Sequence, residues 1–239
     1  MKRKVLAFDF GASSGRAVLG VFEDGKLSME EIYRFSNDPV MVNGTFYWDA
    51  LRLFFEIKQG IQRCVNSGNA DISSIGIDTW GVDFGLIDKY GKLVENPVHY
   101  RDSRTAGMMQ EVCELAGKDN IYSRTGIEFI DINTINHLYS LKKNRPEVLQ
   151  RAARLLFTPD LFAYMLTGNM NVEYTIASTS QLLNAATRDW DDDIISKLGF
   201  DRSLFGKVNP PGTVVGKLLP ELADELGIGR VDVVSVAGH

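Results

Sequence analysis

The sequence predicts an α/β domain with a mixed five-stranded sheet, a hairpin-rich start and a helical insertion. Three observations lead to this class. Short apolar runs alternate with turn residues near the N-terminus, a helical pattern then leads into another apolar run, and a mostly helical stretch precedes the last one. Because the strands come first in hairpin order, the pattern differs from the strict alternation of a Rossmann or barrel fold.

The N-terminal segments are typical of antiparallel strands in sequence order, since each is short, apolar and bounded by turn residues. They cover residues 5–8, 16–22 and 27–35. Trp48 and Asp49 begin an amphipathic helix that extends to Cys64, because apolar residues recur there at helical spacing. Residues 74–78 then return to a strand.

The middle of the chain, roughly residues 103–200, is predicted to be mostly helical and to form an insertion or a cover over one face of the sheet. Ser103 is expected to cap a helix that continues through Met108 and Val112. Further helical patterns begin at Asp119 and cover residues 136–143, 159–166 and 220–226. Residues 231–236 read as a buried strand, the fifth of the expected sheet.

The charge balance argues against two classes of partner. Lys and Arg total 26 against 31 Asp and Glu, a formal net charge of −5, and no stretch concentrates the basic residues. No nucleic acid and no membrane is therefore expected as a partner. The basic residues 2–4 precede an apolar run that Asp9 and Gly11 interrupt, which fits neither a signal peptide nor a membrane span. Cys64 and Cys113 belong to no metal or redox motif, so reduced thiols and a cytoplasmic location are expected.

The most informative segment is a turn of small residues between two predicted strands. Asp9 ends an apolar strand, Gly11–Gly15 leave backbone N–H groups accessible, and Arg16 adds a positive charge. Such a turn can wrap an anion. It is not a Walker A loop, because the Gly-Lys-Ser/Thr ending is missing and the next residues read as a strand instead of a helix.

Two interpretations of this turn stay open. In the first it is a phosphate-binding hairpin, in which backbone amides and the hydroxyls of Ser13 and Ser14 hold the β- and γ-phosphate oxygens, with Arg16 beside them. Asp9 would then hold Mg²⁺ through water, since this ion prefers carboxylates and phosphates. In the second the turn is a plain hairpin, and Asp9 is a hydrogen-bond acceptor at the strand end.

A second group of residues suits a polyhydroxylated ligand. The predicted strand over residues 74–78 leads into Trp80 and Gly81, which offer an indole face and a backbone that a ligand can approach closely. Each member also has a structural interpretation. Trp80 suits a core, Asp83 suits a solvent-facing strand position, and residues 101–104 suit a helix start with local ion pairs. None of them decides the function alone.

Taken together, these segments resemble the FGGY family of carbohydrate kinases and, within it, the rhamnulokinase branch. The resemblance rests on residues 9–16, 77–84, 100–105, 158–160 with 166–168, and 237–239. These motifs cover nearly the whole chain. Other kinases of the family share the hairpin, whereas the Thr79–Asp83 segment looks particular to the rhamnulokinase branch.

The resemblance implies an actin-like (ribonuclease H-like) ATPase domain over residues 1–239, with a second, nucleotide-binding domain that follows it in the family. It also implies that ATP and the sugar bind in the cleft between the two domains, with Mg²⁺ as a further cofactor. The γ-phosphoryl group then moves to a hydroxyl of a ketose, here L-rhamnulose, to give L-rhamnulose 1-phosphate. A small-molecule ketose and ATP are the expected partners, and the oligomeric state is left open.

Carried over residue by residue, the family pattern assigns the ATP phosphates to Ala12, Ser13, Ser14, Gly15 and Arg16. It makes Asp9 the magnesium-side carboxylate and Gly81 and His239 sugar contacts, with Asp83 a weaker candidate. In the family this histidine is followed directly by Asp-Thr, and that aspartate is the general base for the sugar hydroxyl. Since the sequence ends at His239, we expect the isolated chain to be inactive, without this base and without the second domain.

Two other functions stay open at this point. Another kinase of the family would act on xylulose, fuculose or glycerol, and the Thr79–Asp83 segment is the feature that discriminates against it. An actin-like ATPase that does not act on sugars would use the same hairpin for conformational change or assembly. That function would leave Trp80 and Arg101 with packing or surface roles.

Overall fold

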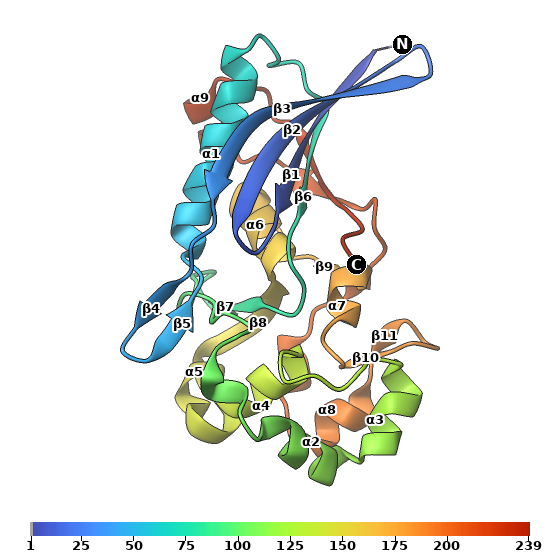
Figure 1. Cartoon of the computed structure of the whole chain (residues 1–239). Helices are drawn as coiled ribbons and strands as arrows, with labels where there is room; N and C mark the ends of the chain where they lie inside the picture. The colour runs from blue at the N-terminus through green and yellow to red at the C-terminus, as the bar shows by residue number, and fades with distance from the viewer. Residues whose placement is uncertain (1) are drawn as a thin grey trace.

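A computed structural model describes residues 2–239, and its largest element is a mixed sheet in the order β13-β14-β6-β1-β2-β3 (Figure 1). The bounds of these strands are β1 (Arg3–Phe10), β2 (Ser14–Glu23), β3 (Lys26–Ser36), β6 (Ser74–Asp78), β13 (Val214–Lys217) and β14 (Asp232–Ser235). β1 pairs antiparallel with β2 and parallel with β6, and β14 pairs parallel with β6. The three parallel strands therefore end at the same edge of the sheet.

The expected fold class is confirmed, but the number of strands in the main sheet is six instead of five. The additional strand is β13, which pairs antiparallel with β14 and carries a bulge between Val214 and Gly216. None of its four residues is buried. Such a short, partly exposed edge strand lacks the alternation of buried apolar residues from which strands are predicted, so the sequence did not reveal it.

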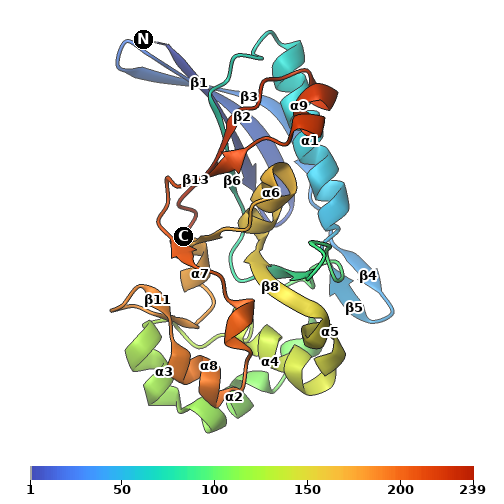
Figure 2. The ribbon, with the colours of Figure 1, turned by 180° about the vertical axis from the view of Figure 1, so that it is seen from behind.

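Three helices cover one face of the sheet: α1 (Ala50–Asn66), α6 (Thr158–Thr167) and α9 (Pro220–Leu226) (Figures 1 and 2). Because side chains alternate along a strand, Leu6, Phe8 and Phe10 of β1 all point to this face and are buried. Phe10 stacks on Phe162 of α6, with ring centroids 5.3 Å apart. Gly60 lets α1 approach β1, since a Cβ at this position would lie 2.5 Å from the ring of Phe8.

The helical region forms a second body beyond the edge at which the parallel strands end (Figure 1). Its helices are η1 (Ser103–Thr105), α2 (Met108–Ala116), α3 (Lys118–Thr125), α4 (Thr134–Asn144), α5 (Pro146–Arg151), α7 (Tyr174–Ser178), α8 (Asp192–Lys197) and η2 (Arg202–Leu204). Short strands accompany them: β4 (Val40–Val42), β5 (Thr45–Tyr47), β7 (Phe84–Asp88), β8 (Ala152–Phe157), β9 (Val172–Glu173), β10 (Leu183–Asn184), β11 (Asp189–Trp190) and β12 (Val208–Asn209). A separate buried cluster around Ile135, Phe157 and Trp190 holds this body together.

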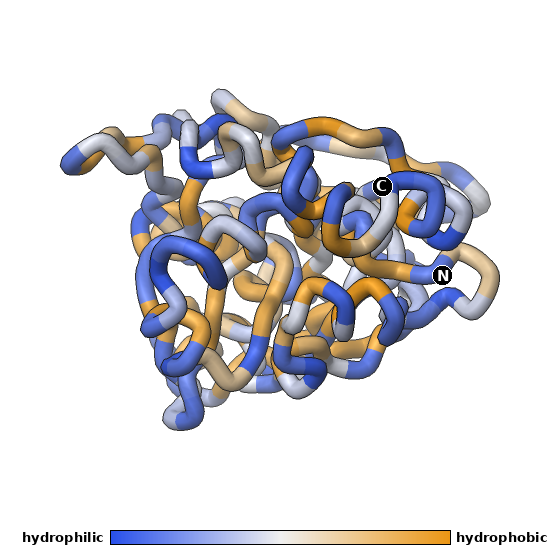
Figure 3. The backbone as a smooth tube through the Cα atoms, turned by 90° about the horizontal axis from the view of Figure 1, so that it is seen from below, coloured by the Kyte–Doolittle hydropathy of each residue, from blue (hydrophilic) through white to orange (hydrophobic). Residues whose placement is uncertain are grey.

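The tube in Figure 3 shows hydrophobic segments in the interior and hydrophilic turns around them, as two packed cores require. Of the stretch expected to be helical, α6 is the part that packs on the sheet, while the other helices belong to the second body. No helix within residues 2–239 has both the length and the apolar composition needed to cross a membrane.

The helix expected from Ser103 through Val112 is wrong, because the structure has two elements there. Asp102 caps the short η1 helix by accepting a hydrogen bond from the Arg104 backbone N–H at 2.9 Å. Gly107 then adopts a left-handed conformation, with φ of 76°, and α2 begins at the next residue. A glycine in this conformation interrupts the helical hydrogen-bond series, so the chain turns between the two helices.

Candidate functional site

The parallel strands bring two carboxylates together at the edge of the sheet. Asp9 at the end of β1 and Asp78 at the end of β6 are register partners. The chain beyond β14 crosses the same place, and Gly238 lies so close that a Cβ there would be 2.1 Å from Asp78 Oδ1. Ligands of open α/β sheets bind outside the carboxyl ends of the strands. This edge is therefore the natural place for a site.

The turn between β1 and β2 is a tight hairpin that Asn37 holds through two hydrogen bonds. The Gly11 backbone N–H donates to the Ser14 carbonyl at 2.9 Å. Asn37 is buried, and its side-chain amide donates to the Gly11 carbonyl at 2.8 Å while its backbone N–H donates to the Ser13 carbonyl at 3.0 Å. Ala12 and Ser13 are exposed at the tip. The carbonyls of the turn thus face inward to Asn37, which sequence reasoning did not single out.

Arg16 lies on the same face as Asp9. Its Nε and a terminal nitrogen lie 2.9 Å and 2.8 Å from Asp9 Oδ2, and both side chains are about half exposed. Asp9 is therefore a hydrogen-bond acceptor, as the second interpretation of this turn expected. Because an exposed ion pair is weak, Arg16 can exchange this partner for an anion without a large loss.

Gly15, the remaining residue of the expected phosphate turn, is buried. A Cβ at this position would lie 2.3 Å from the ring of Phe35, so the glycine is required for packing of β2 against β3. We expect Gly15→Ala to lower the free energy of unfolding by about 1–3 kcal/mol through overpacking, measured by urea unfolding. Gly229→Ala is the matched control, because a Cβ there meets nothing within 4 Å.

A double substitution separates packing from a backbone effect in this prediction. Phe35→Leu removes the ring edge that the new methyl group would meet, so we expect the cost of Gly15→Ala to be smaller in that background. Equal costs in both backgrounds, or a Gly15→Ala protein as stable as the Gly229→Ala control, would contradict the packing role.

The charge at this edge is predominantly negative. Burial raises the pKa of Asp78, His239 lowers it, and the Asp9 and Glu173 carboxylates raise it further. Two carboxylates at neighbouring strand ends, one of which raises the pKa of the other, suit a divalent cation, which removes the repulsion between them. Asp78 was not among the expected site residues, although its position at the end of a strand, as with Asp9, was a signal that could have found it.

An open cavity of about 500 Å³ lies next to these carboxylates, between the sheet edge and the helical body. Its lining consists of Trp80, Gly81, Val82, Tyr100, Arg101, Ile127, Ile130, Ile132, Asn133, Thr179 and His239. Three residues that the sequence singled out for a sugar therefore meet here: Trp80, Gly81 and His239. The isoleucines, Asn133 and Thr179 come from the helical body, and their distance in sequence hid them from motif reasoning.

Gly81 is packed closely by its neighbours. A Cβ at this position would lie 3.2 Å from Thr179 Cγ2 and 3.3 Å from His239 Cε1. The next residue, Val82, has φ of 66°, which is strained for a β-branched side chain. Thr179 Oγ1 accepts from the Val82 N–H at 3.0 Å, and Thr134 Oγ1 donates to the Val82 carbonyl at 2.6 Å. These bonds hold the strained turn that presents Gly81 to the cavity.

Asp83 does not line this cavity, so the expectation that it contacts a sugar directly requires correction. It is 2% exposed, which also excludes the solvent-facing strand position. Its Oδ2 accepts hydrogen bonds from the indole N–H of Trp48 at 2.5 Å and of Trp80 at 2.8 Å, and from the Tyr100 N–H at 3.2 Å. Burial raises the pKa of Asp83 to about 7, against the lowering effect of these donors. Asp83 thus orients Trp80 from behind the cavity wall.

The segment over residues 101–104 contains both a structural residue and a residue that lines the cavity. Asp102 is structural, because Oδ2 accepts from the Phe46 N–H at 2.7 Å while Oδ1 caps η1. Arg101 lines the cavity, with its guanidinium carbon 5.3 Å from the centre of the Tyr100 ring. A cation and hydrogen-bond donors therefore reach the cavity from this side.

His239 enters the cavity from the opposite side, through the chain that follows β14. Its Nε2 lies 3.2 Å from the Thr79 carbonyl. The backbone N–H groups of Gly238 and His239 lie 3.2 Å and 3.4 Å from Thr175 Oγ1. The histidine is thus held by the Thr79 carbonyl, just after β6, and by the Thr175 side chain of α7.

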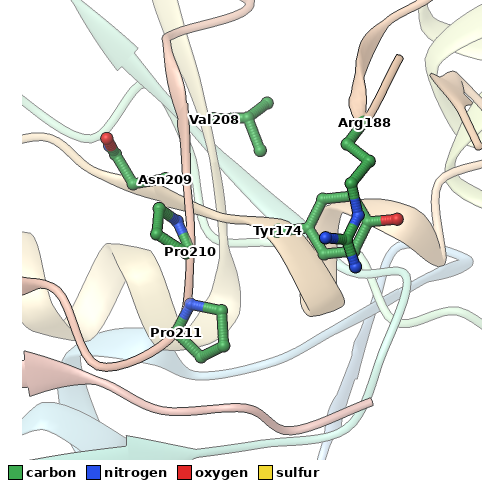
Figure 4. A pocket seen from close by; sticks show the side chains of 6 residues that line it. All are labelled: Tyr174, Arg188, Val208, Asn209, Pro210 and Pro211. Atoms are coloured by element: carbon green, nitrogen blue, oxygen red, sulfur yellow. The ribbon is translucent and has the colours of Figure 1, made fainter. Parts of the chain in front are cut away.

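A smaller cavity of about 240 Å³ shares no residue with the first (Figure 4). It lies between Tyr174, Val208, Asn209 and the Pro210-Pro211 turn, with Arg188 on its rim. The Arg188 guanidinium carbon is 4.9 Å from the centre of the Tyr174 ring, and Figure 4 shows the two side chains overlapping. None of the residues expected to bind phosphate or sugar lies here.

Comparisons with known proteins agree with this geometry. A model of the N-terminal domain of the FGGY family of carbohydrate kinases matches residues 4–239. Over 239 residues the chain is 44% identical to a rhamnulokinase of Oceanobacillus iheyensis and 41% identical to one of Bacteroides thetaiotaomicron. These matches cover 100% of this chain but 50% and 49% of the two relatives. The chain therefore spans about half the length of the curated relatives it matches.

The solved structures show the same fold. A gluconate kinase and a ligand-bound xylulose kinase, both of Lactobacillus acidophilus, match with TM-scores of 0.88 and 0.86 at 20% identity. The matches cover 100% and 99% of this chain and 48% of each of those chains. The expected actin-like architecture is confirmed by this likeness. Since the family model matches almost the whole sequence, the chain belongs to the FGGY family of carbohydrate kinases, as its N-terminal domain.

Proposed function

We propose that the full-length protein is an ATP-dependent ketose kinase that phosphorylates L-rhamnulose to L-rhamnulose 1-phosphate, and that this chain supplies its sugar-binding half. One observation carries the proposal. The small-residue hairpin, the Asp9–Asp78 pair and the cavity lined by Trp80, Gly81 and His239 meet at the edge where β1, β6 and β14 end. A phosphate donor and a hydroxyl acceptor can therefore bind side by side, which is the main requirement of phosphoryl transfer.

On the phosphate side, the exposed tip at Ala12 and Ser13, together with Ser14, would hold the nucleotide phosphates through backbone amides and hydroxyls. Arg16 would turn from Asp9 to the anion and add charge. Asp9 and Asp78 fit Mg²⁺, because the ion accepts one or two carboxylates along with phosphates and water. When bound, Mg²⁺ would neutralise charge on the phosphate oxygens.

On the sugar side, the Trp80 indole would stack on the ring or chain of the ketose, held in place by Asp83. Gly81 would leave room for the ligand beside His239, whose imidazole would hydrogen-bond a hydroxyl. The general base that the family resemblance assigns to the position after His239 lies outside this sequence. Phosphoryl transfer is therefore proposed for the full-length protein.

Two observations support L-rhamnulose among ketoses. The relatives that match at 41–44% identity are rhamnulokinases. In addition, Ile127, Ile130 and Ile132 give the cavity an apolar wall. L-rhamnulose carries a methyl group in place of its last hydroxymethyl group, so one end of the ligand is apolar. A hydrophobic contact with one such methyl contributes about 1–3 kcal/mol of discrimination.

Steady-state kinetics of the full-length protein with L-rhamnulose, D-xylulose and glycerol test this function. We expect the highest kcat/KM with L-rhamnulose, and a rise of its KM by about 10² or more in Gly81→Arg, because the new side chain displaces His239 and fills the cavity. Gly229→Ala is the control, since nothing lies within 4 Å of its Cβ. Preference for D-xylulose or glycerol would overturn the sugar assignment, and ATP turnover that no sugar stimulates would support the ATPase alternative.

A cytoplasmic location belongs to the same proposal. That compartment supplies ATP and Mg²⁺, the cofactors that the hairpin and the carboxylate pair would bind, and the relatives named above are rhamnulokinases.

A further inference from the structure

The start of α7 carries a buried carboxylate with an unusual set of partners. Glu173 is 2% exposed and caps the helix: Oε1 accepts from the Thr175 N–H at 2.8 Å, and Oε2 accepts from the Ile176 N–H at 3.0 Å. Oε2 also lies 2.6 Å from Thr175 Oγ1. A separation of this size is typical of a hydroxyl that donates to a carboxyl oxygen.

The direction of this hydrogen bond determines what Thr175 can offer elsewhere. Both Glu173 oxygens accept backbone N–H groups, and the other two neighbours of Thr175 Oγ1 are N–H groups that can only donate, so the single hydroxyl hydrogen of Thr175 points to Glu173. Its remaining lone pairs face the backbone N–H groups of Gly238 and His239, at 3.2 Å and 3.4 Å. Glu173 therefore fixes Thr175 as an acceptor for the two amides that precede the imidazole in the cavity.

The backbone of Glu173 is itself held by buried groups. The Glu173 backbone N–H donates to both oxygens of Asp160, at 3.2 Å each, and the Asn171 side chain donates to Asp160 Oδ1 at 3.2 Å. Asp160 and Asn171 are both buried. A series of hydrogen bonds thus runs from Asp160 of α6 through Glu173 of β9 to Thr175 of α7, and it ends at the backbone of Gly238 and His239.

We propose that Thr175 and Glu173 are positioning residues for the sugar site. Thr175 holds the Gly238–His239 backbone, so that the imidazole keeps its place beside Gly81 and the Thr79 carbonyl. Glu173 sets the direction of the Thr175 hydroxyl. The inference rests on the proposed function for its kinetic consequence, but the anchor itself is a property of the fold.

Two measurements on the full-length protein test the proposal. Thr175→Val keeps the shape of the side chain and removes the acceptor, whereas Thr175→Ser keeps the acceptor. We expect Thr175→Val to speed amide hydrogen exchange in the peptide that contains Gly238 and His239, and to raise the KM for L-rhamnulose by about 10-fold to 100-fold with the KM for ATP unchanged. Thr175→Ser should restore both. Glu173→Gln should act as Thr175→Val does, because the amide no longer fixes the hydroxyl direction.

The outcomes separate this proposal from the proposed function. Unchanged hydrogen exchange in Thr175→Val would overturn the anchor whatever the activity. An equal rise of both KM values, together with a lower melting temperature that Thr175→Ser does not restore, would overturn positioning in favour of a general structural role. A wild-type protein that phosphorylates none of the sugars, but whose Gly238–His239 exchange still depends on Thr175, would count against the proposed function and in favour of the anchor.

Discussion

Asp9→Asn is expected to lower kcat of the full-length protein with ATP and L-rhamnulose by about 10² to 10³, the usual cost of one preorganised charge at a reacting centre. The change is isosteric and removes one of the two carboxylates that end β1 and β6 as register partners. The substitution therefore removes half of the carboxylate charge that this pair offers to Mg²⁺. The Mg²⁺ concentration for half-maximal rate should rise as well, which a titration of rate against Mg²⁺ measures.

A loss of kcat that comes from lower stability can be separated from one that comes from weaker Mg²⁺ binding. The Asp9–Arg16 pair is half exposed, so its removal costs little stability, and the melting temperature should change by no more than a few degrees. Asp71→Asn is the matched control, because Asp71 is an exposed carboxylate that pairs with Lys4 far from the cavity. Activity of Asp9→Asn within a few-fold of wild type at low Mg²⁺ would rule out Asp9 as the magnesium-side carboxylate.

The strands of the main sheet and the three helices on it were mostly visible in the sequence, because their apolar residues follow the period of their element. The helix at 220–226 was predicted with the bounds that the structure has. The prediction was wrong where the local structure depends on a backbone conformation or a tertiary contact that the hydrophobic pattern does not contain. The break at Gly107 depends on a left-handed residue that a helical pattern does not reveal, and β13 exists because β14 offers it an edge.

The site shows the same division. Trp80 and Gly81, in the segment after β6, were predicted to suit a sugar, and both line the cavity. A local motif can reveal such residues because they belong to the motif itself. Asp83 was interpreted as a ligand contact or a solvent-facing residue, although the two indoles that bury it come from positions 48 and 80. Asn37 and Thr175 support the site from segments that no motif connects to it. Such positioning depends on distances that only the fold sets.

Stability should fall as pH rises from 6.5 to 8, by roughly 2 kcal/mol, because two buried carboxyl groups keep their protons in the folded state. Burial raises the pKa of Asp83 from 3.8 to about 7 and that of Asp160 from 3.8 to about 8. In the unfolded chain both release their protons near pH 3.8. The folded state thus binds more protons, so the stabilisation is complete below pH 3.8 and is lost as pH rises through 7 and 8. Each retained proton contributes a slope of about −1.4 kcal/mol per pH unit.

The comparison begins at pH 6.5 because, below this pH, two histidines make the stability rise with pH and so oppose the effect of the carboxyl groups. Burial lowers the pKa of His99 to about 4 and that of His137 to about 3, so at these two positions the unfolded chain binds more protons than the folded one until pH passes the unfolded pKa of 6.5. Two histidines and two carboxyl groups then nearly cancel, and stability should be almost flat from pH 5 to 6.5. At pH 6.5 the two histidines are still half protonated in the unfolded chain, and this opposing contribution fades over the next pH unit, so the two carboxyl groups determine the sign of the change between pH 6.5 and 8.

Urea unfolding of this chain at pH 6.5 and 8, followed by tryptophan fluorescence, measures the difference. Asp160→Asn cannot titrate, so its stability should depend less on pH over this window, whereas Asp71→Asn should behave as the wild type does. A wild-type protein whose stability rises from pH 6.5 to 8 would mean that Asp83 and Asp160 are ionised in the folded state. The indoles of Trp48 and Trp80 would then hold a charge behind the cavity wall, and Asp83 would orient Trp80 as an anion at every pH at which the protein works.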